Sequence, residues 1–170
     1  MDMGRRVERA IHQTHLIHAG LPLFRQESQN ALEALLEVSD SIMTYRARYK
    51  STFQLAPVLD LLLADESNPK SLAFQFSQLA DHVDQLHKRN ERRFSSAEDR
   101  LVLEMLTTVR LLDLTGIECE KGSSENKALA QFLVSMETLL KEFAQQISGH
   151  YLSRVPAIPH YTMNPGDRSE

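Results

Sequence analysis

Polar side chains that could bind a ligand or take part in catalysis lie near the start of the chain. They are Arg5, Glu8, Arg9 and His12, and several of them are three or four residues apart. Residues three or four positions apart lie on the same face of an α-helix, so these side chains would form one patch. Guanidinium groups bind carboxylates and phosphates through paired hydrogen bonds. The spacing therefore predicts a candidate binding cluster for a small carboxylate or phosphate.

Arg46 is expected to join this cluster from the second helix of the chain, where it falls inside the apolar arc. A guanidinium in that position needs an acceptor, because an unpaired buried charge is costly. We expect Glu8 to be that acceptor, in a partly buried ion pair with Arg5 or Arg9 alongside. The alternative is that the N-terminal charges form a solvated helix end and Arg46 extends to water.

Glu8, His12 and His15 also have a spacing at which one helix face could offer three metal ligands. Metal sites in helical bundles usually take their ligands from more than one helix, and the confirming HExxH pattern is missing. Exposed histidines are common on helices. We therefore assign neither a metal nor another cofactor to the chain.

One basic cluster lies in the stretch LHKRNERR and consists of Lys88, Arg89, Arg92 and Arg93. Cations at the end of a helix interact favourably with its dipole, so a well-charged helix end is one interpretation. The other is a patch for an acidic or phosphate-bearing partner, because local basic patches steer such partners.

The whole chain has 170 residues, 42% of them apolar, and a net charge of -4. No overall basic field exists to hold nucleic acid or an anionic membrane, and no apolar run approaches the ~20 residues that cross a bilayer. Cys119 is the single cysteine, which excludes an intrachain disulfide. These features favour a cytoplasmic protein that binds neither nucleic acid nor a membrane.

Sequence motifs for catalysis are missing. The six glycines form no phosphate-binding loop, and no GxSxG nucleophile elbow occurs. Cys119 lies between Glu118 and Glu120, whose negative charges oppose thiolate formation. We therefore assign no catalytic residue, although the cluster around Glu8 keeps a ligand-binding or enzymatic interpretation open.

The elements that position these residues are helical, because the apolar residues recur at three-four spacing almost everywhere. We expect a single all-α bundle of about six helices with short loops over residues 1–153, and a proline-containing flexible tail over 154–170. Gly20 and Pro22 should end the first helix, and the second should run over residues 26–50.

Two later helices carry start signals. Asn68 is expected to cap one of them, with Pro69 in its first turn. Ser96, with Asp99 three residues later, predicts a capping box for the next.

Four stretches resemble the bacterial alpha-E domain family, an all-helical family of unknown function: MGRRVERA, TYRARY, QLAPVLDLLLADESNPKSLAFQ and the YL pair near the end. The family is named for a Glu-Arg motif, which matches Glu8 and Arg9 here. The resemblance covers Met3 to Leu152, and the third stretch is its most specific part.

This resemblance implies a module that works with other polypeptides. Family members are about twice as long, and this chain resembles their C-terminal half. Apolar surface on the first, second or fifth helix is then expected to be left for a missing partner. Members occur beside, or fused to, ATP-grasp proteins that resemble peptide or amide ligases. The implied partner is such a ligase or the missing half, and self-association is a third interpretation.

Overall fold

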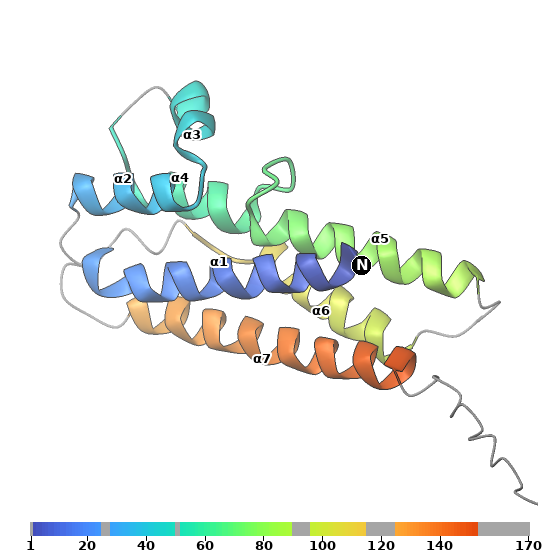
Figure 1. Cartoon of the computed structure of the whole chain (residues 1–170). Helices are drawn as coiled ribbons and strands as arrows, with labels where there is room; N and C mark the ends of the chain where they lie inside the picture. Colours follow the sequence, from blue (N-terminus) through green and yellow to red (C-terminus); the bar gives the residue numbers. More distant parts are fainter. Residues whose placement is uncertain (1, 25–27, 50–51, 90–95, 115–124, 153–170) are drawn as a thin grey trace, which may run out of the picture.

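The computed structural model describes residues 2–24, 28–49, 52–89, 96–114 and 125–152, and over these ranges the protein is all-α, as predicted. Four long helices form a bundle: α1 (Asp2–Phe24), α5 (Leu72–Arg89), α6 (Ala97–Arg110) and α7 (Glu125–Leu152). Shorter elements cover one end of it (Figure 1): α2 (Gln29–Val38), α3 (Ile42–Tyr49), α4 (Leu55–Leu59) and the π-helix η1 (Asp60–Ala64).

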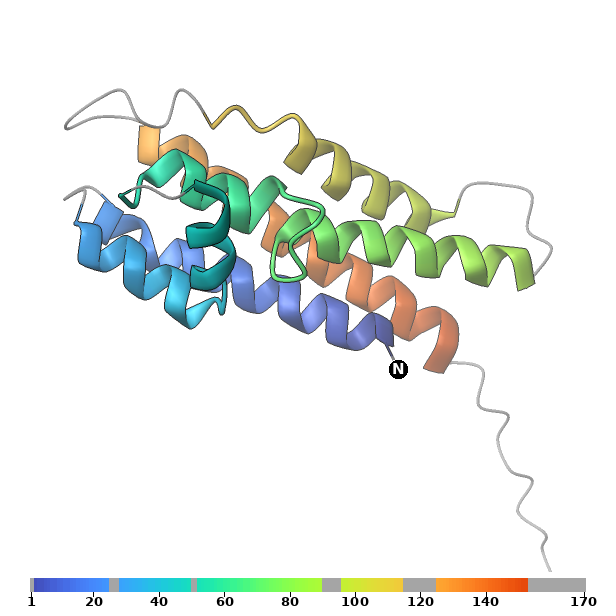
Figure 2. The same cartoon turned by 90° about the horizontal axis from the view of Figure 1, so that it is seen from above.

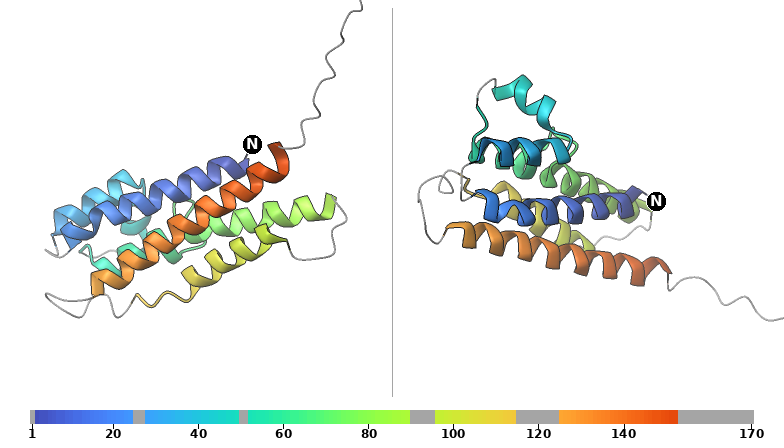
Figure 3. Two further views of the ribbon diagram at one scale, coloured as in Figure 1. Left: turned by 90° about the horizontal axis from the view of Figure 1, so that it is seen from below. Right: turned by 60° about the vertical axis from the view of Figure 1, so that its left-hand side comes forward.

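The four long helices pack as a ring, in which α1 contacts α5 and α7, and α6 contacts the same two helices from the other side. Viewed from above, α1 therefore lies along one edge of the bundle and α6 along the opposite edge (Figure 2). The two views of Figure 3 show α2 and α3 outside this ring, with α3 farther from α1 than α2 is.

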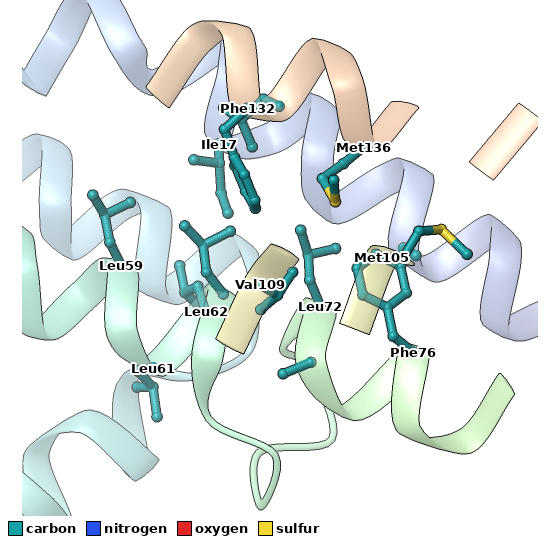
Figure 4. Packing of buried hydrophobic residues seen from close by; sticks show 14 of the residues in the cluster. Ile17, Leu59, Leu61, Leu62, Leu72, Phe76, Met105, Val109, Phe132 and Met136 are labelled. Atoms are coloured by element: carbon teal, nitrogen blue, oxygen red, sulfur yellow. The ribbon is translucent and has the colours of Figure 1, made fainter. Parts of the chain in front are cut away.

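Apolar side chains from every wall of the ring meet in one core (Figure 4). Ile17 of α1, Leu62 of η1, Phe76 of α5, Met105 of α6 and Met136 of α7 are all inaccessible to solvent. The three-four spacing of the sequence thus identified the inward face of the long helices. Burial of these faces supplies the main favourable free energy of folding.

The first helix is longer than predicted. It passes through Gly20 and Pro22 and ends at Phe24. Pro22 removes one helical hydrogen bond, but the last turn buries Leu21 and Phe24 in the core. This packing outweighs the local stop signal, because tertiary contacts supply most of the stability of a helix.

The predicted second helix is in fact two helices with a break between them. Asp40 adopts a left-handed φ of 52° just after α2, a conformation that aspartate tolerates better than most residues. The amide of Ser41 then donates to the carbonyl of Leu36 over 2.8 Å, which closes the helix end. The chain turns here, so α3 leaves the direction of α2.

Of the two predicted helix starts, one is confirmed and one is displaced. Ser96 accepts from the Asp99 amide at 3.3 Å, and the Asp99 carboxylate accepts from the Ser96 amide at 2.8 Å. By contrast, α5 begins at Leu72, and Ser71 caps it by accepting from the Phe74 amide at 3.0 Å. Asn68 is buried within the loop between η1 and α5, where its side chain donates a hydrogen bond to the Leu61 carbonyl of η1.

Large apolar side chains lie exposed on α1, α2, α3 and α6, which correspond to the first, second and fifth predicted helices, at the C-cap of α6 and on α7: Leu23, Val38, Met43, Leu103, Leu111 and Val134. They are spread over five helices and form no single patch by sequence position. Whether a partner covers any of them stays a prediction. The predicted tail over 154–170 lies outside the described residues.

Candidate functional site

The outer face of α1 carries most of the predicted polar cluster. Arg5, Glu8, Arg9 and His12 are all exposed there, and their spacing places them within two turns of one another. Within the described part of the chain, no hydrogen bond or ion pair joins any of these four side chains to another residue. The cluster therefore has charges available for a group outside the chain.

Arg6, next in sequence to Arg5, has the opposite role. Its side chain is 16% exposed, and its guanidinium pairs with Asp2 at 3.3 Å and lies 5.5 Å from the centre of the Phe74 ring on α5. His82 of α5 contacts the same Asp2 carboxylate at 2.9 Å. The His82 hydrogen bond, helped by Arg6, lowers the pKa of Asp2. These contacts join α1 to α5.

The pattern could have identified Arg6 as the inward arginine, since it lies at three-four spacing between Met3, which packs against the core, and the core residue Ala10. The sequence analysis assigned Arg6 no role of its own. Its long apolar stem explains how an arginine occupies the margin of a core.

His15 connects α1 to α7. Its Nε2 atom lies 3.1 Å from the Glu137 carboxylate, which also accepts a hydrogen bond from Lys141 at 2.6 Å. Lys141 first, and His15 second, lower the pKa of Glu137. The set Glu8, His12 and His15 is thus divided by this contact, and no group of three metal-ligating side chains gathers in the ranges that the structure describes.

Arg46 does not pair with Glu8, so that prediction is wrong. The guanidinium donates to Glu33 of α2 at 2.7 Å and lies 5.9 Å from the ring centre of Phe53, and its side chain is 55% exposed. The cause is the break at Asp40: a continuous helix would have carried Arg46 along the bundle, whereas α3 turns outward. Arg46 therefore lies apart from the α1 cluster.

The predicted basic patch is largely outside the described residues. Arg92 and Arg93 fall in an undescribed range. Lys88 and Arg89 belong to the last turn of α5, but the described side chains of that helix end before them. The patch stays a prediction.

A second polar cluster surrounds the loop between η1 and α5, and the sequence reasoning missed it. Arg48 of α3 pairs with Asp65 and donates to the Ser67 hydroxyl at 2.7 Å, while the Tyr49 hydroxyl donates to Asp60 at 3.2 Å. Burial raises the pKa of Tyr49, and the Asp60 carboxylate raises it further. π-Helices often occur at functional sites, which makes η1 a reasonable place to look for one.

This loop cluster is nevertheless internally paired. Glu66 accepts from Arg110 of α6 at 2.5 and 2.9 Å, and Lys70 pairs with Asp40 at 2.9 Å. The Arg110 hydrogen bonds lower the pKa of Glu66. Because these charges already have partners, the cluster holds the loop between η1 and α5 against α3 on one side and against α6 on the other. The signal that could have found it is the run of aspartate, glutamate and serine directly after an apolar segment.

Taken together, the geometry defines a helical domain whose first helix presents unpaired charges on its outer face. The chain belongs to the alpha-E family, whose model is described as a predicted alpha-helical domain with a conserved ER motif and matches residues 1–152. Glu8 and Arg9 supply such an ER pair on the outer face of α1.

Curated relatives support this assignment. An uncharacterised protein of Mycobacterium bovis and one from each of two Mycobacterium tuberculosis strains are 30% identical to the chain over 155 residues. The match covers 90% of this chain but 17% of each relative, so the chain spans less than a fifth of their length. No solved structure matches the chain. No helix among the described residues is long and apolar enough to cross a bilayer.

Proposed function

We propose that the chain is a non-catalytic interaction module of the cytoplasm that works with an ATP-grasp-type peptide or amide ligase. The observation that carries this proposal is the outer face of α1, where Arg5, Glu8 and Arg9 are exposed and have no described partner. Exposed polar residues that a family conserves usually serve binding rather than folding. Glu8 and Arg9 resemble the ER motif in the description of the family, and we take them as that pair.

The lengths of the relatives support a module that acts within a larger assembly. The chain corresponds to 17% of each mycobacterial relative, so in those proteins the domain occurs together with much additional polypeptide. The choice of a ligase as partner rests on the family resemblance. Ligase chemistry would belong to that partner, and this chain would position it or its substrate.

Co-expression of the tagged chain with an ATP-grasp-type ligase of the kind that occurs beside family members tests the proposal. We expect the two proteins to co-purify at a fixed ratio. Light scattering should then show a complex whose molar mass equals the sum of its components. Absence of association at low and moderate salt, with and without ATP and Mg²⁺, would remove the proposed function. A helical protein of similar net charge serves as the negative partner.

A second candidate function is the capture of a small carboxylate or phosphate by Arg5 and Arg9. The observation in its favour is that both guanidinium groups lack a described acceptor and lie one helical turn apart. Calorimetric titration with inorganic phosphate and with glutamate separates the two functions. Saturable binding that is lost in Arg5→Gln/Arg9→Gln would favour ligand capture, whereas the module predicts no measurable heat.

A further inference from the structure

The outer face of α1 contains a regular stripe that runs the length of the helix, called here the outer stripe. Its members recur at alternating intervals of four and three residues: Arg5, Arg9, His12, Leu16, Ala19 and Leu23. This is the 3.5-residue repeat with which one helix packs along another. At ~1.5 Å per residue the stripe is about 27 Å long, enough for five turns of a partner helix.

Most of the outer stripe is accessible. All its members except Leu16 are exposed, and Leu16 is partly buried where it also contacts the core. In the view of Figure 1, no other described helix crosses in front of α1. Because Ala19 and Leu23 are exposed as well as Arg5 and Arg9, the helices that pack on α1 leave this face accessible at both of its ends.

The two ends of the outer stripe differ in chemistry. Arg5 and Arg9 give the N-terminal half its positive charge, with His12 next in the stripe. The other half is apolar, and Leu23 is 51% exposed there. The stripe therefore has a direction, basic at one end and apolar at the other.

Arg5 and Arg9 also differ from most arginines with described side chains in having no described ion pair, a property that they share with Arg100 of α6. Four arginines with described side chains pair with carboxylates of the same chain: Arg6, Arg46, Arg48 and Arg110. Within the described ranges, Arg5 and Arg9 have no such pair, although Glu8 lies between them in sequence. Two unpaired guanidinium groups one turn apart match two carboxylates one turn apart on a facing helix.

The polarity of the stripe argues against a second copy of the chain as its occupant. A parallel pair would bring Arg5 and Arg9 against the same cations of the copy. An antiparallel pair would bring them against Ala19 and Leu23, which can offer no acceptor. Both arrangements are unfavourable, so the stripe fits a different sequence.

We propose that the outer stripe is the docking surface for one amphipathic helix of a partner polypeptide, with carboxylates facing Arg5 and Arg9 and apolar residues facing Ala19 and Leu23. This assignment rests on the proposed function, because it names the surface through which the module binds. Glu8 flanks the stripe rather than lying in it, as charged residues beside a helix seam do. A basic residue of the partner would face Glu8 and help to set its orientation.

The experiment uses the full chain and two designed helical peptides. One peptide carries glutamates in one half of its seam and leucines in the other half, and the second carries lysines instead of the glutamates. Each is made in both sequence orders to cover parallel and antiparallel binding. Fluorescence anisotropy at low salt should show that the glutamate peptide binds the chain more tightly than the lysine peptide does.

Charge reversal supplies the decisive comparison. Arg5→Glu/Arg9→Glu should weaken binding of the glutamate peptide about tenfold and favour the lysine peptide, since two exposed ion pairs of ordinary strength together contribute about one factor of ten. Leu23→Ser should weaken binding of both peptides about tenfold. All three positions are exposed, so the thermal unfolding of these variants should match that of the wild type.

Matched controls come from α6, on the opposite edge of the bundle. Arg100 is exposed there and, like Arg5, has no described ion pair, and Leu103 is an exposed leucine like Leu23. Arg100→Glu and Leu103→Ser should leave peptide affinity unchanged. Equal losses in these controls, or failure of both peptides to bind, would overturn the proposal.

Other occupants would give different results. Concentration-dependent dimerisation that Arg5→Glu/Arg9→Glu abolishes would identify a second copy instead. Binding to phosphatidylserine vesicles without binding to either peptide would identify an anionic membrane surface instead.

The ligase experiment separates this inference from the proposed function. If the ligase co-purifies equally with the wild type and with Arg5→Glu/Arg9→Glu, the module function stands and the outer stripe is the wrong surface. If the peptides bind as expected but the ligase does not co-purify, the surface stands and the ligase is the wrong partner.

Discussion

The side-chain nitrogen of Asn68 donates a hydrogen bond of 2.8 Å to the backbone carbonyl of Leu61. Leu61 lies in the π-helix η1, and both residues are buried. Carbonyls in the last turn of a helix lack a donor from the helix itself, and a buried carbonyl without a donor is costly. Asn68 satisfies this one and thereby holds the following loop against the π-helix.

Asn68→Ala should lower the free energy of unfolding by about 1–3 kcal/mol, because it leaves the Leu61 carbonyl buried without its donor. Urea denaturation followed by circular dichroism measures the loss. Asn30, which is exposed on α2, provides the control, and Asn30→Ala should change stability by less than about 0.5 kcal/mol. Equal effects of the two substitutions would show that the hydrogen bond contributes little.

Asp65 should make stability depend on pH. Burial raises the pKa of this carboxyl, but hydrogen bonds from Ser67 and the ion pair with Arg48 outweigh it and hold the pKa below the ordinary 3.8. The resulting stabilisation is present above pH 3.8 and is lost as the pH falls through the lower pKa of the folded state.

Asp65→Asn should therefore cost about 1 kcal/mol at neutral pH and progressively less in acid. Unfolding curves of the wild type and the variant across the acidic range measure this difference. Asp81→Asn, at an exposed position of α5, should show no such convergence. A difference that is constant down to the lowest pH would argue against an ion-pair contribution from Asp65.

The charges of Glu8 and Arg46 should be energetically independent. Glu8→Gln is expected to change the free energy of unfolding by less than about 0.5 kcal/mol, because Glu8 is exposed and has no described partner. A double-mutant cycle on Glu33 and Arg46 should instead give a salt-sensitive coupling of about 0.2–1 kcal/mol. A larger coupling between Glu8 and Arg46 would restore the original hypothesis.

Replacing Gln13 by an apolar residue should stabilise the fold. Its side chain is buried on α1, and among the residues that the structure describes its Nε2 atom has no hydrogen-bond partner. Gln13→Met removes this unpaired donor and keeps a flexible, unbranched side chain. We expect thermal unfolding to show a stabilisation of about 1 kcal/mol, and no gain from Gln145→Met at an exposed position of α7. A loss of stability in Gln13→Met would indicate that the amide is needed.

Helical periodicity predicted the fold class and the inward faces of the helices. The residues that a helix buries recur every three or four positions, and this spacing is visible in the sequence itself. Val7, Ala10 and Ile17 occupy the core as the pattern requires. Boundaries were less predictable, since they depend on competition between local signals and packing. Pro22 did not end α1, because the burial of Phe24 in the core outweighs the stop signal. Ser96 and Asp99, by contrast, form the expected capping box.

The candidate site was predictable only within one helix. Arg5, Glu8, Arg9 and His12 share a face because helix geometry alone decides it. The position of Arg46 depended on the left-handed turn at Asp40, which no periodic pattern reveals. Contacts between distant segments, such as Arg48 with Asp65, depend on the whole fold and were therefore not foreseen.

We propose that the chain binds another protein through the outer face of α1, and one experiment tests this binding directly. The most direct test is co-purification of the proposed partner, an ATP-grasp-type ligase, with three forms of the chain: wild type, Arg5→Glu/Arg9→Glu and Arg100→Glu. We expect the ligase to be retained by the wild type and by Arg100→Glu and to be lost from the α1 variant. Retention by all three forms, or by none, would contradict it.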